Sequence, residues 1–181
     1  MPRVYVLGAS GSGMTTQGDA LAAALGVPHA DSDDFLWLPT NPPFTTKRDT
    51  VDRRALLRAP LPVSGSWVFS GSALSWDDEI APFYDLIVFL RLDPVERMAR
   101  LRRREVARYG DRIAAGGDMA AIHTAFMEWA ASYDDGGLGH RSLLSHETWL
   151  ATQTTPILRL TTTDSVPSMI RTVKTLLYTD E

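Results

Sequence analysis

The sequence predicts an α/β fold in which five parallel strands form one sheet with helices on both faces. Short apolar runs alternate with segments of helical periodicity along the chain, which is typical of a parallel sheet with covering helices. The runs are continuously apolar, as expected of strands that are buried on both faces. In addition, a glycine-rich turn joins the first apolar run directly to the first helical segment.

The apolar runs place the five strands at residues 3–7, 27–30, 67–70, 86–90 and 157–160. The first helix is expected over residues 13–25, because Met14, Leu21 and Leu25 share one helical face. Gly26 follows that face directly and suits the position after a helix end.

Asp93 and Pro94 predict the start of a second long helix. Aspartate is a favourable N-cap residue, and proline is favourable at the first helical position. The helical pattern continues through Leu101 and Glu105. The last helix is expected over residues 167–177.

Two segments do not fit the alternation of strands and helices. Residues 39–46 contain three prolines and lead into a small helical excursion that ends near Leu57. Residues 110–118 contain three glycines and separate the second long helix from a further helical pattern over residues 122–133. Neither segment is long enough for a core of its own, so we expect residues 1–181 to form a single domain.

Composition excludes several classes of function. The 181 residues include no cysteine, which excludes disulfide frameworks, thiolate catalysis and cysteine-ligated zinc, and fits a cytoplasmic location. The first apolar run ends at Gly8, which is too short for a signal peptide, and no window approaches 18 apolar residues. We therefore expect no association with a membrane.

The basic residues are unusual in kind and in place. Arginine accounts for 16 of the 18, and eight of them lie between residues 91 and 112 together with four carboxylates, a local balance of 8 − 4 = +4. The whole chain carries a net charge of −4. A guanidinium-rich patch on an acidic protein indicates a local phosphate or carboxylate site and not a nucleic-acid surface.

The turn after the first strand is the most informative segment. It reads Gly8-Ala9-Ser10-Gly11-Ser12-Gly13-Met14-Thr15-Thr16 and matches the phosphate-binding pattern G-x-x-x-x-G-K-[ST] except at the lysine, which is Met14. Glycines let successive N–H groups turn toward an anion, and the helix N-terminus adds its positive end. The Thr15 hydroxyl is then placed to bind Mg²⁺. Because Met14 carries no charge, phosphoryl transfer needs a cation from elsewhere.

Two alternatives for this turn stay open. A dinucleotide-binding turn is suggested by Gly8, Gly11 and an acidic residue, Asp31, twenty residues later, but the third glycine of that pattern is replaced by Met14 or Thr16. The chain also lacks a Tyr-x-x-x-Lys pair. The other alternative is a glycine-rich and serine-rich turn without a ligand.

With this turn, the chain resembles the adenylate-kinase-like P-loop kinases, which include nucleoside monophosphate, shikimate and gluconate kinases. The resemblance covers the turn, the Asp31-Ser32-Asp33-Asp34 run, the arginine-rich helix and the closing strand and helix. It is greatest to bacterial proteins that carry G-A-S-G-x-G-x-T-T without the lysine. The resemblance implies a three-layer P-loop NTPase sandwich, ATP and Mg²⁺ as cofactors, an acceptor-binding excursion at about 35–60 and a lid at about 109–121.

Three aspartates follow the second strand at its carboxyl end, where open α/β sheets bind ligands. Carboxylates this close repel one another unless a cation or a donor lies between them, so Asp31, Asp33 and Asp34 suggest Mg²⁺ or a substrate hydroxyl. An acidic N-cap of a short helix explains them as well. The resemblance implies that Asp31 belongs to the metal shell, with Thr15, and that Asp33 orients the acceptor, with Asp34 beside it.

The excursion supplies cations and a close turn. Lys47 and Arg48 follow two threonines and form either an anion clamp or a solvated helix start. In the clamp, Lys47 is also a candidate to lean toward the phosphates that Met14 cannot touch. Gly71 ends the third strand between two serines, where it permits close approach of a ligand or simply makes a turn.

The arginines of the second long helix recur at spacings of three and four residues and share a face: Arg97, Arg100, Arg104 and Arg108. The resemblance implies that Arg100 lies on the base side of the nucleotide, that Arg104 and Arg108 act on the transferring phosphate, and that Arg141 is the basic residue beyond the lid. A solvated helix with interspersed glutamates explains about half of these arginines equally well.

The remaining polar and aromatic positions are interpreted as structural. His123 and His146 show no metal-ligand spacing, and Trp129 and Tyr133 are expected in the core. The sequence thus predicts an ATP-binding phosphotransferase that acts on a small acceptor. A nucleotide-binding protein without efficient kinase activity, acting as a sensor or partner-binding module, is the alternative, and Met14 is the residue that separates the two.

Overall fold

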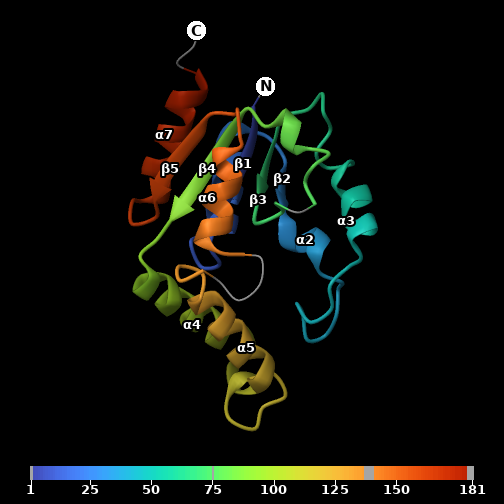
Figure 1. The fold of residues 1–181 in the computed structure, drawn as a ribbon, viewed down its shortest axis with the longest axis vertical. Helices are drawn as coiled ribbons and strands as arrows, with labels where there is room; N and C mark the ends of the chain where they lie inside the picture. The colour runs from blue at the N-terminus through green and yellow to red at the C-terminus, as the bar shows by residue number, and fades with distance from the viewer. Residues whose placement is uncertain (1, 75, 137–140, 179–181) are drawn as a thin grey trace.

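The computed structural model describes residues 2–74, 76–136 and 141–178. Five parallel strands form one sheet in the order β2-β3-β1-β4-β5, which confirms the predicted fold class (Figure 1). The strands are β1 (Arg3–Gly8), β2 (His29–Asp31), β3 (Trp67–Ser70), β4 (Leu86–Arg91) and β5 (Ile157–Thr161). Each overlaps the apolar run that predicted it.

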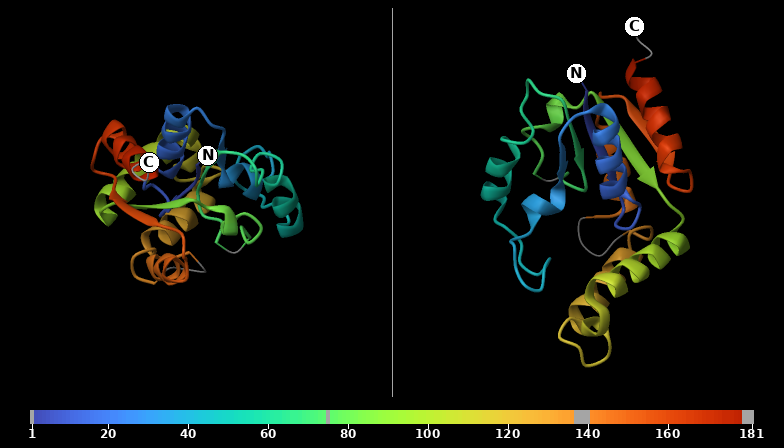
Figure 2. Two further views of the ribbon diagram at one scale, coloured as in Figure 1. Left: turned by 90° about the horizontal axis from the view of Figure 1, so that it is seen from above. Right: turned by 180° about the vertical axis from the view of Figure 1, so that it is seen from behind.

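Helices cover both faces of the sheet. They are α1 (Met14–Leu25), α2 (Ser32–Leu36), α3 (Thr50–Leu57), α4 (Pro94–Tyr109), α5 (Ala120–Ala131), α6 (Leu143–Ala151) and α7 (Val166–Tyr178), with 3₁₀ turns η1 (Ala81–Phe83) and η2 (Gly110–Ile113). Helices α1 and α7 lie on one face and α6 lies on the other (Figure 2). None of these helices is long and apolar enough to cross a membrane, as far as the described residues extend.

The strands bury alternate residues in two separate cores. Val4 and Val6 of β1 pack in one core with Leu21 of α1 and with residues of α7. Tyr5 and Leu7 face the other core, which contains aromatic residues of β3 and β4 and part of α6. Full burial of each of these side chains contributes about 1.5–3 kcal/mol, so the strand positions are strongly specified.

The carboxyl ends of the strands point toward α4 and α5, which extend beyond the sheet (Figures 1 and 2). Helix α4 begins as the sequence predicts, because the Asp93 side chain accepts hydrogen bonds from the N–H groups of Val95 and Glu96, with Pro94 at the first position. Met98 and Leu101 of α4 pack on α5. This arrangement places the arginine-rich helix over the same edge of the sheet as the glycine-rich turn.

Helix α6 has no counterpart in the sequence prediction. It begins with a capping box in which Ser142 and Ser145 exchange side-chain and backbone hydrogen bonds. The usual sequence signal has glutamate or glutamine at the third position, and serine there is easily overlooked. The buried residues of this helix include His146, which does not contribute to an apolar pattern.

Candidate functional site

The glycine-rich turn between β1 and α1 leaves the N-terminus of α1 open. Gly11 and Gly13 adopt φ values of 85° and 95°, in the left-handed region that favours glycine. Gly13 is the N-cap of α1 and provides no side-chain hydrogen bond to the first turn. Ser12 is fully buried inside the turn, and within residues 2–74, 76–136 and 141–178 its Oγ has no hydrogen-bond partner. The turn therefore presents unpaired polar groups at the positive end of a helix.

Thr15 and Asp31 come together at this helix end. The Thr15 Oγ1 donates a hydrogen bond to Asp31 Oδ2 at 2.6 Å, and the Ser70 Oγ donates to the same oxygen at 3.3 Å. The other oxygen, Asp31 Oδ1, accepts a hydrogen bond from the Asp33 N–H and caps α2. Asp31 therefore serves as a helix cap and as the partner of Thr15 at the same time.

These two side chains fit a Mg²⁺ ion. The described residues contain no group of three or more His, Cys, Asp or Glu side chains arranged to hold a metal. Mg²⁺ usually keeps several waters and takes one or two protein oxygens together with substrate phosphates. A hydroxyl and a carboxylate oxygen 2.6 Å apart at the glycine-rich turn suit that requirement.

Arg141 lies against the turn, although it is 133 residues away from Gly8 in the sequence. Its Nη2 donates to the Gly8 carbonyl oxygen at 2.8 Å and lies 3.8 Å from the Met14 Sδ, and its guanidinium lies over the Trp129 ring at 5.7 Å. The Nε is buried and has no hydrogen-bond partner among the described residues. Burial lowers the pKa of Arg141 from its usual value, whereas the nearby Asp33 carboxylate raises it. An arginine keeps its charge under such a shift.

A cavity of about 1800 Å³ extends from the turn toward the excursion and α6. Asp33, Trp37 and Lys47 line it, as does Arg53 of α3, whose guanidinium lies over the Trp76 ring at 5.8 Å. Arg53 was not predicted from the sequence.

The Asp33 carboxylate faces this cavity in an environment that favours its protonated form. Burial, followed by the charge of Asp31, raises the pKa of Asp33 above its usual value. Arg141, the Trp37 indole and Arg104 act in the opposite direction. The indole Nε1 donates to Asp33 Oδ1 at 3.3 Å, which orients the carboxylate. A partly desolvated carboxylate of this kind is a stronger base than one in water.

Some predicted residues lie outside the cavity lining. Asp34 is among them, and so is Arg48, whose Nε donates to the Phe35 carbonyl oxygen at 3.1 Å. Gly71 does line the cavity, with φ of 113°, and a β-carbon there would overlap the Ser32 hydroxyl. The tight packing of Gly71 on Ser32 is a structural reason for the glycine. The acceptor-binding roles of Asp34, Arg48 and Gly71 stay predictions.

Three arginines of α4 line the cavity at different points. Arg100 Nη2 donates to the Thr162 carbonyl oxygen at 3.0 Å, after β5. Arg104 forms an ion pair with Glu105 at 3.1 Å. Arg108 lies 4.5 Å from the centre of the Phe44 ring, which belongs to the excursion. The shared helical face therefore spreads its cations along the cavity and does not focus them on one point.

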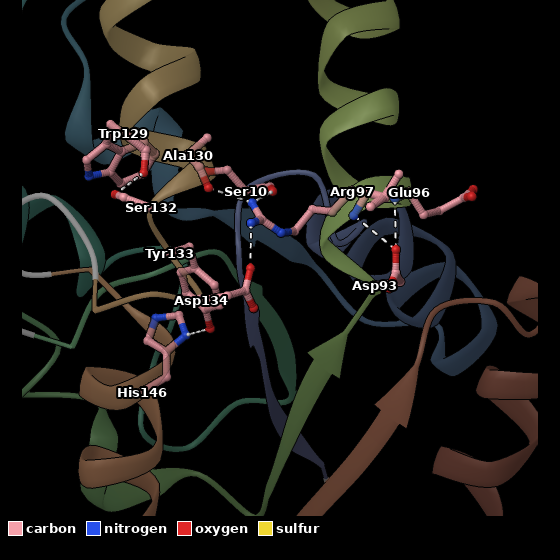
Figure 3. Close-up of polar contacts among 11 residues, drawn as sticks. Ser10, Asp93, Glu96, Arg97, Trp129, Ala130, Ser132, Tyr133, Asp134 and His146 are labelled. Carbon is pink, nitrogen blue, oxygen red and sulfur yellow. Dashed lines mark hydrogen bonds and ion pairs between the residues drawn. The ribbon is translucent and has the colours of Figure 1, made fainter.

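Arg97, the remaining arginine of that face, supports the turn. Only 1% of its side chain is exposed, and it donates hydrogen bonds to the Ala130 carbonyl oxygen, to Asp134 and to the Ser10 carbonyl oxygen (Figure 3). Arg97 lies four residues before Leu101 and therefore shares the buried side of α4. This spacing is the sequence pattern from which the burial of Arg97 could have been predicted.

A buried polar chain ends at the cavity wall. The Tyr133 hydroxyl lies 2.7 Å from His146 Nδ1 (Figure 3), and His146 Nε2 lies 3.3 Å from the Ser72 Oγ. His146 is fully buried, and burial, assisted by the charge of Arg141, lowers its pKa to about 3. The imidazole is therefore neutral at physiological pH and joins the core to the cavity.

We expect the stability contributed by neutral His146 to be lost in acid. In the unfolded chain the imidazole takes up a proton below its usual pKa of 6.5, whereas in the folded chain it does so only near pH 3. The contribution is therefore fully present above pH 6.5 and falls, by up to about 1.4 kcal/mol per pH unit, as the pH drops toward 3. Urea unfolding at several pH values between these limits measures the slope.

The variant His146→Gln provides the reference for this measurement. Burial raises the pKa of Asp77 to about 6. Over part of the same pH range, Asp77 therefore makes the free energy of unfolding rise as the pH falls, which is opposite to the effect of His146. The slope of the wild type minus that of the variant removes this contribution. Equal slopes in the two proteins would show that His146 takes up its proton normally in the folded state.

Comparison with known proteins gives one sequence relative and many similar structures. No family model matches the chain. A Bacillus subtilis (strain 168) protein with the name uncharacterized protein YqaC is 40% identical over 157 residues, which is 87% of this chain and 86% of that protein.

The solved structures show the fold. A gluconokinase from Sinorhizobium meliloti 1021 matches with a TM-score of 0.54 and 19% identity over 94% of this chain and 87% of its own. A shikimate kinase from Acinetobacter baumannii in complex with shikimate matches with a TM-score of 0.57 and 15% identity over 100% and 95% of the two chains. The described chain has the fold of P-loop kinases of this kind.

Proposed function

The chain belongs to the family of the Bacillus subtilis protein YqaC and has a P-loop kinase fold, and we propose that it is an ATP-dependent phosphotransferase. It binds ATP and Mg²⁺ at the glycine-rich turn and moves the γ-phosphate to a small acceptor. The observation that supports this most directly is the contact of 2.6 Å between Thr15 and Asp31 at the open N-terminus of α1.

The nucleotide end of the proposed site uses the turn and α4. The N–H groups of residues 11–15 and the helix N-terminus bind the phosphates. Thr15 and Asp31 hold the Mg²⁺, directly or through water, and the bound ion neutralises phosphate charge. Arg100 of α4, which is held by the Thr162 carbonyl oxygen after β5, borders the base. Arg104 and Arg108 lie along the phosphates and next to the proposed lid at about 109–121.

The acceptor end is formed by the proposed excursion at about 35–60 and by α3. Asp33 accepts the proton of an acceptor hydroxyl and aligns its oxygen for in-line attack. Lys47 and Arg53 line the same cavity and are placed to bind an anionic group of the acceptor. Two of the similar structures are a gluconokinase and a shikimate kinase in complex with shikimate. Gluconate and shikimate each combine hydroxyls with a carboxylate, and nucleoside monophosphates combine hydroxyls with a phosphate.

The nucleotide and metal parts of the proposal are tested by thermal denaturation. We expect ATP with Mg²⁺ to raise the melting temperature, because a ligand at 100 times its Kd stabilises the folded state by about 2.7 kcal/mol. We expect Thr15→Val, which keeps the side-chain shape and removes the hydroxyl, to lose the increment that Mg²⁺ adds. The increment from ATP without Mg²⁺ should remain.

Thr172→Val, an exposed threonine of α7, is the matched control and should keep both increments. The proposal is contradicted if no nucleotide raises the melting temperature at millimolar concentration. Retention of the full Mg²⁺ increment by Thr15→Val would remove Thr15 from the metal site.

A nucleotide-binding protein without efficient kinase activity is the second candidate function. Met14 favours it, because the uncharged side chain cannot stabilise the β- and γ-phosphates during transfer. The two functions differ in turnover and not in binding. Formation of ADP in the presence of gluconate, shikimate or a nucleoside monophosphate supports the kinase, and ATP binding without ADP formation supports the second candidate.

A further inference from the structure

The glycine-rich turn has an apolar side chain where its pattern calls for an ammonium group. Met14 is the first residue of α1 and packs against the core between the sheet and the helices α1 and α7. It can neither donate a hydrogen bond nor carry a charge. A turn that holds a triphosphate in this form needs a cation whose side chain comes from another part of the chain.

Arg141 reaches the end of the Met14 side chain. Its Nη2 lies 3.8 Å from the Met14 Sδ and 2.8 Å from the Gly8 carbonyl oxygen, which it holds by a hydrogen bond. A guanidinium has five N–H donors, and this bond uses one of them. The Nε–H is buried and finds no partner in the described part of the chain, and the side chain lines the same cavity as the turn.

Two other cations that line the cavity, Lys47 and Arg104, are engaged elsewhere. The Lys47 Nζ lies over the Trp37 ring at 5.8 Å, on the acceptor side of the cavity. Arg104 is paired with Glu105 at 3.1 Å and lies over the Phe126 ring at 5.6 Å. Within the described residues, neither forms a hydrogen bond with Met14 or with the rest of the turn.

We propose that Arg141 supplies the positive charge that Met14 lacks and binds the terminal phosphates of ATP. This assignment rests on the proposed function. A planar guanidinium binds phosphate oxygens through two parallel hydrogen bonds, so it stabilises a triphosphate more than a monophosphate. The Trp129 ring and the Gly8 carbonyl oxygen fix its orientation before the nucleotide binds.

Calorimetric titration with ATP, ADP and AMP in the presence of Mg²⁺ tests the proposal by affinity, independently of turnover. Arg141→Gln keeps an N–H donor for the Gly8 carbonyl oxygen and removes the charge. We expect it to weaken ATP binding by about tenfold, equivalent to about 1.4 kcal/mol, and to leave AMP binding nearly unchanged. Adding Met14→Lys to Arg141→Gln should restore ATP affinity, because the ammonium then comes from the turn itself.

Met14→Lys alone should strengthen ATP binding less than it does in the Arg141→Gln background, since Arg141 already supplies a cation at this position. Arg171→Ala, an exposed arginine of α7, controls for the loss of a charge elsewhere. Equal weakening of ATP and AMP by Arg141→Gln, or failure of Met14→Lys to restore affinity, would overturn the assignment and leave Arg141 a structural support of the turn. Absence of ATP binding in the wild type would instead overturn the proposed function.

If Arg141→Gln lowers the melting temperature, Arg141→Lys keeps a charge at the position and provides a second measurement. The preference for ATP over AMP should then survive in Arg141→Lys. Loss of that preference in a folded Arg141→Lys protein, together with its retention in the double variant, would show that the turn needs a positive charge and that a lysine at position 141 does not reach the phosphates. Loss in both would contradict the role of this charge.

Discussion

Replacing Asp33 by asparagine is expected to lower phosphoryl transfer by about 10²–10⁴-fold, the usual contribution of a positioned general base. The carboxylate lines the cavity, and burial together with Asp31 raises its pKa and therefore its basicity. Asparagine is nearly the same size and still accepts the hydrogen bond from the Trp37 Nε1. The substitution therefore removes the base and leaves the local packing in place.

The measurement is the rate of ADP formation with the acceptor that gives turnover, alongside a calorimetric Kd for ATP. We expect the Kd to change by less than about threefold, because the phosphates are bound by the turn and not by Asp33. Asp52→Asn, on the exposed side of α3, is the matched control. Full transfer activity in Asp33→Asn would show that the carboxylate only shapes the start of α2.

Replacing Arg97 by methionine is expected to destabilise the fold by about 2–4 kcal/mol, somewhat less than the loss of a fully buried ion pair because Asp134 is 22% exposed. Methionine retains the packing of the aliphatic stem, so the loss reports on the guanidinium. The Ala130 carbonyl oxygen and Asp134 would lose a donor that lies 2.9 Å and 2.8 Å away, respectively.

Urea denaturation measures this difference, and Arg102→Ala, at an exposed position of α4, should change stability by less than about 0.5 kcal/mol. The Arg97 guanidinium also donates to the Ser10 carbonyl oxygen at 3.4 Å. ATP binding should therefore weaken at temperatures where Arg97→Met is still folded. A stability change as small as that of Arg102→Ala would mean that water replaces the guanidinium at its partners.

The predictable part of the fold depended on local patterns. Residues 86–90 read as a buried strand because every side chain is apolar, and β4 covers them. Asp93 and Pro94 start α4 because the cap acts within one turn. Helix α6 was missed because its cap uses Ser145 and its buried face contains His146, so its sequence shows no clear apolar period.

The same division holds for the candidate site. The sequence by itself determined the turn of residues 8–16 and the place of Asp31 after a strand, because glycine spacing and a strand end are local properties. The pairing of Asp31 with Thr15 was implied by the resemblance to P-loop kinases, and the structure shows the contact at 2.6 Å. Only the tertiary structure decided which arginines form hydrogen bonds with the turn. Arg141 meets the carbonyl oxygen of Gly8 across 133 residues of sequence, and Arg97 meets that of Ser10 across 87. Such contacts follow from how helices pack over the sheet, and a long flexible arginine side chain carries no sign of its partner in the sequence.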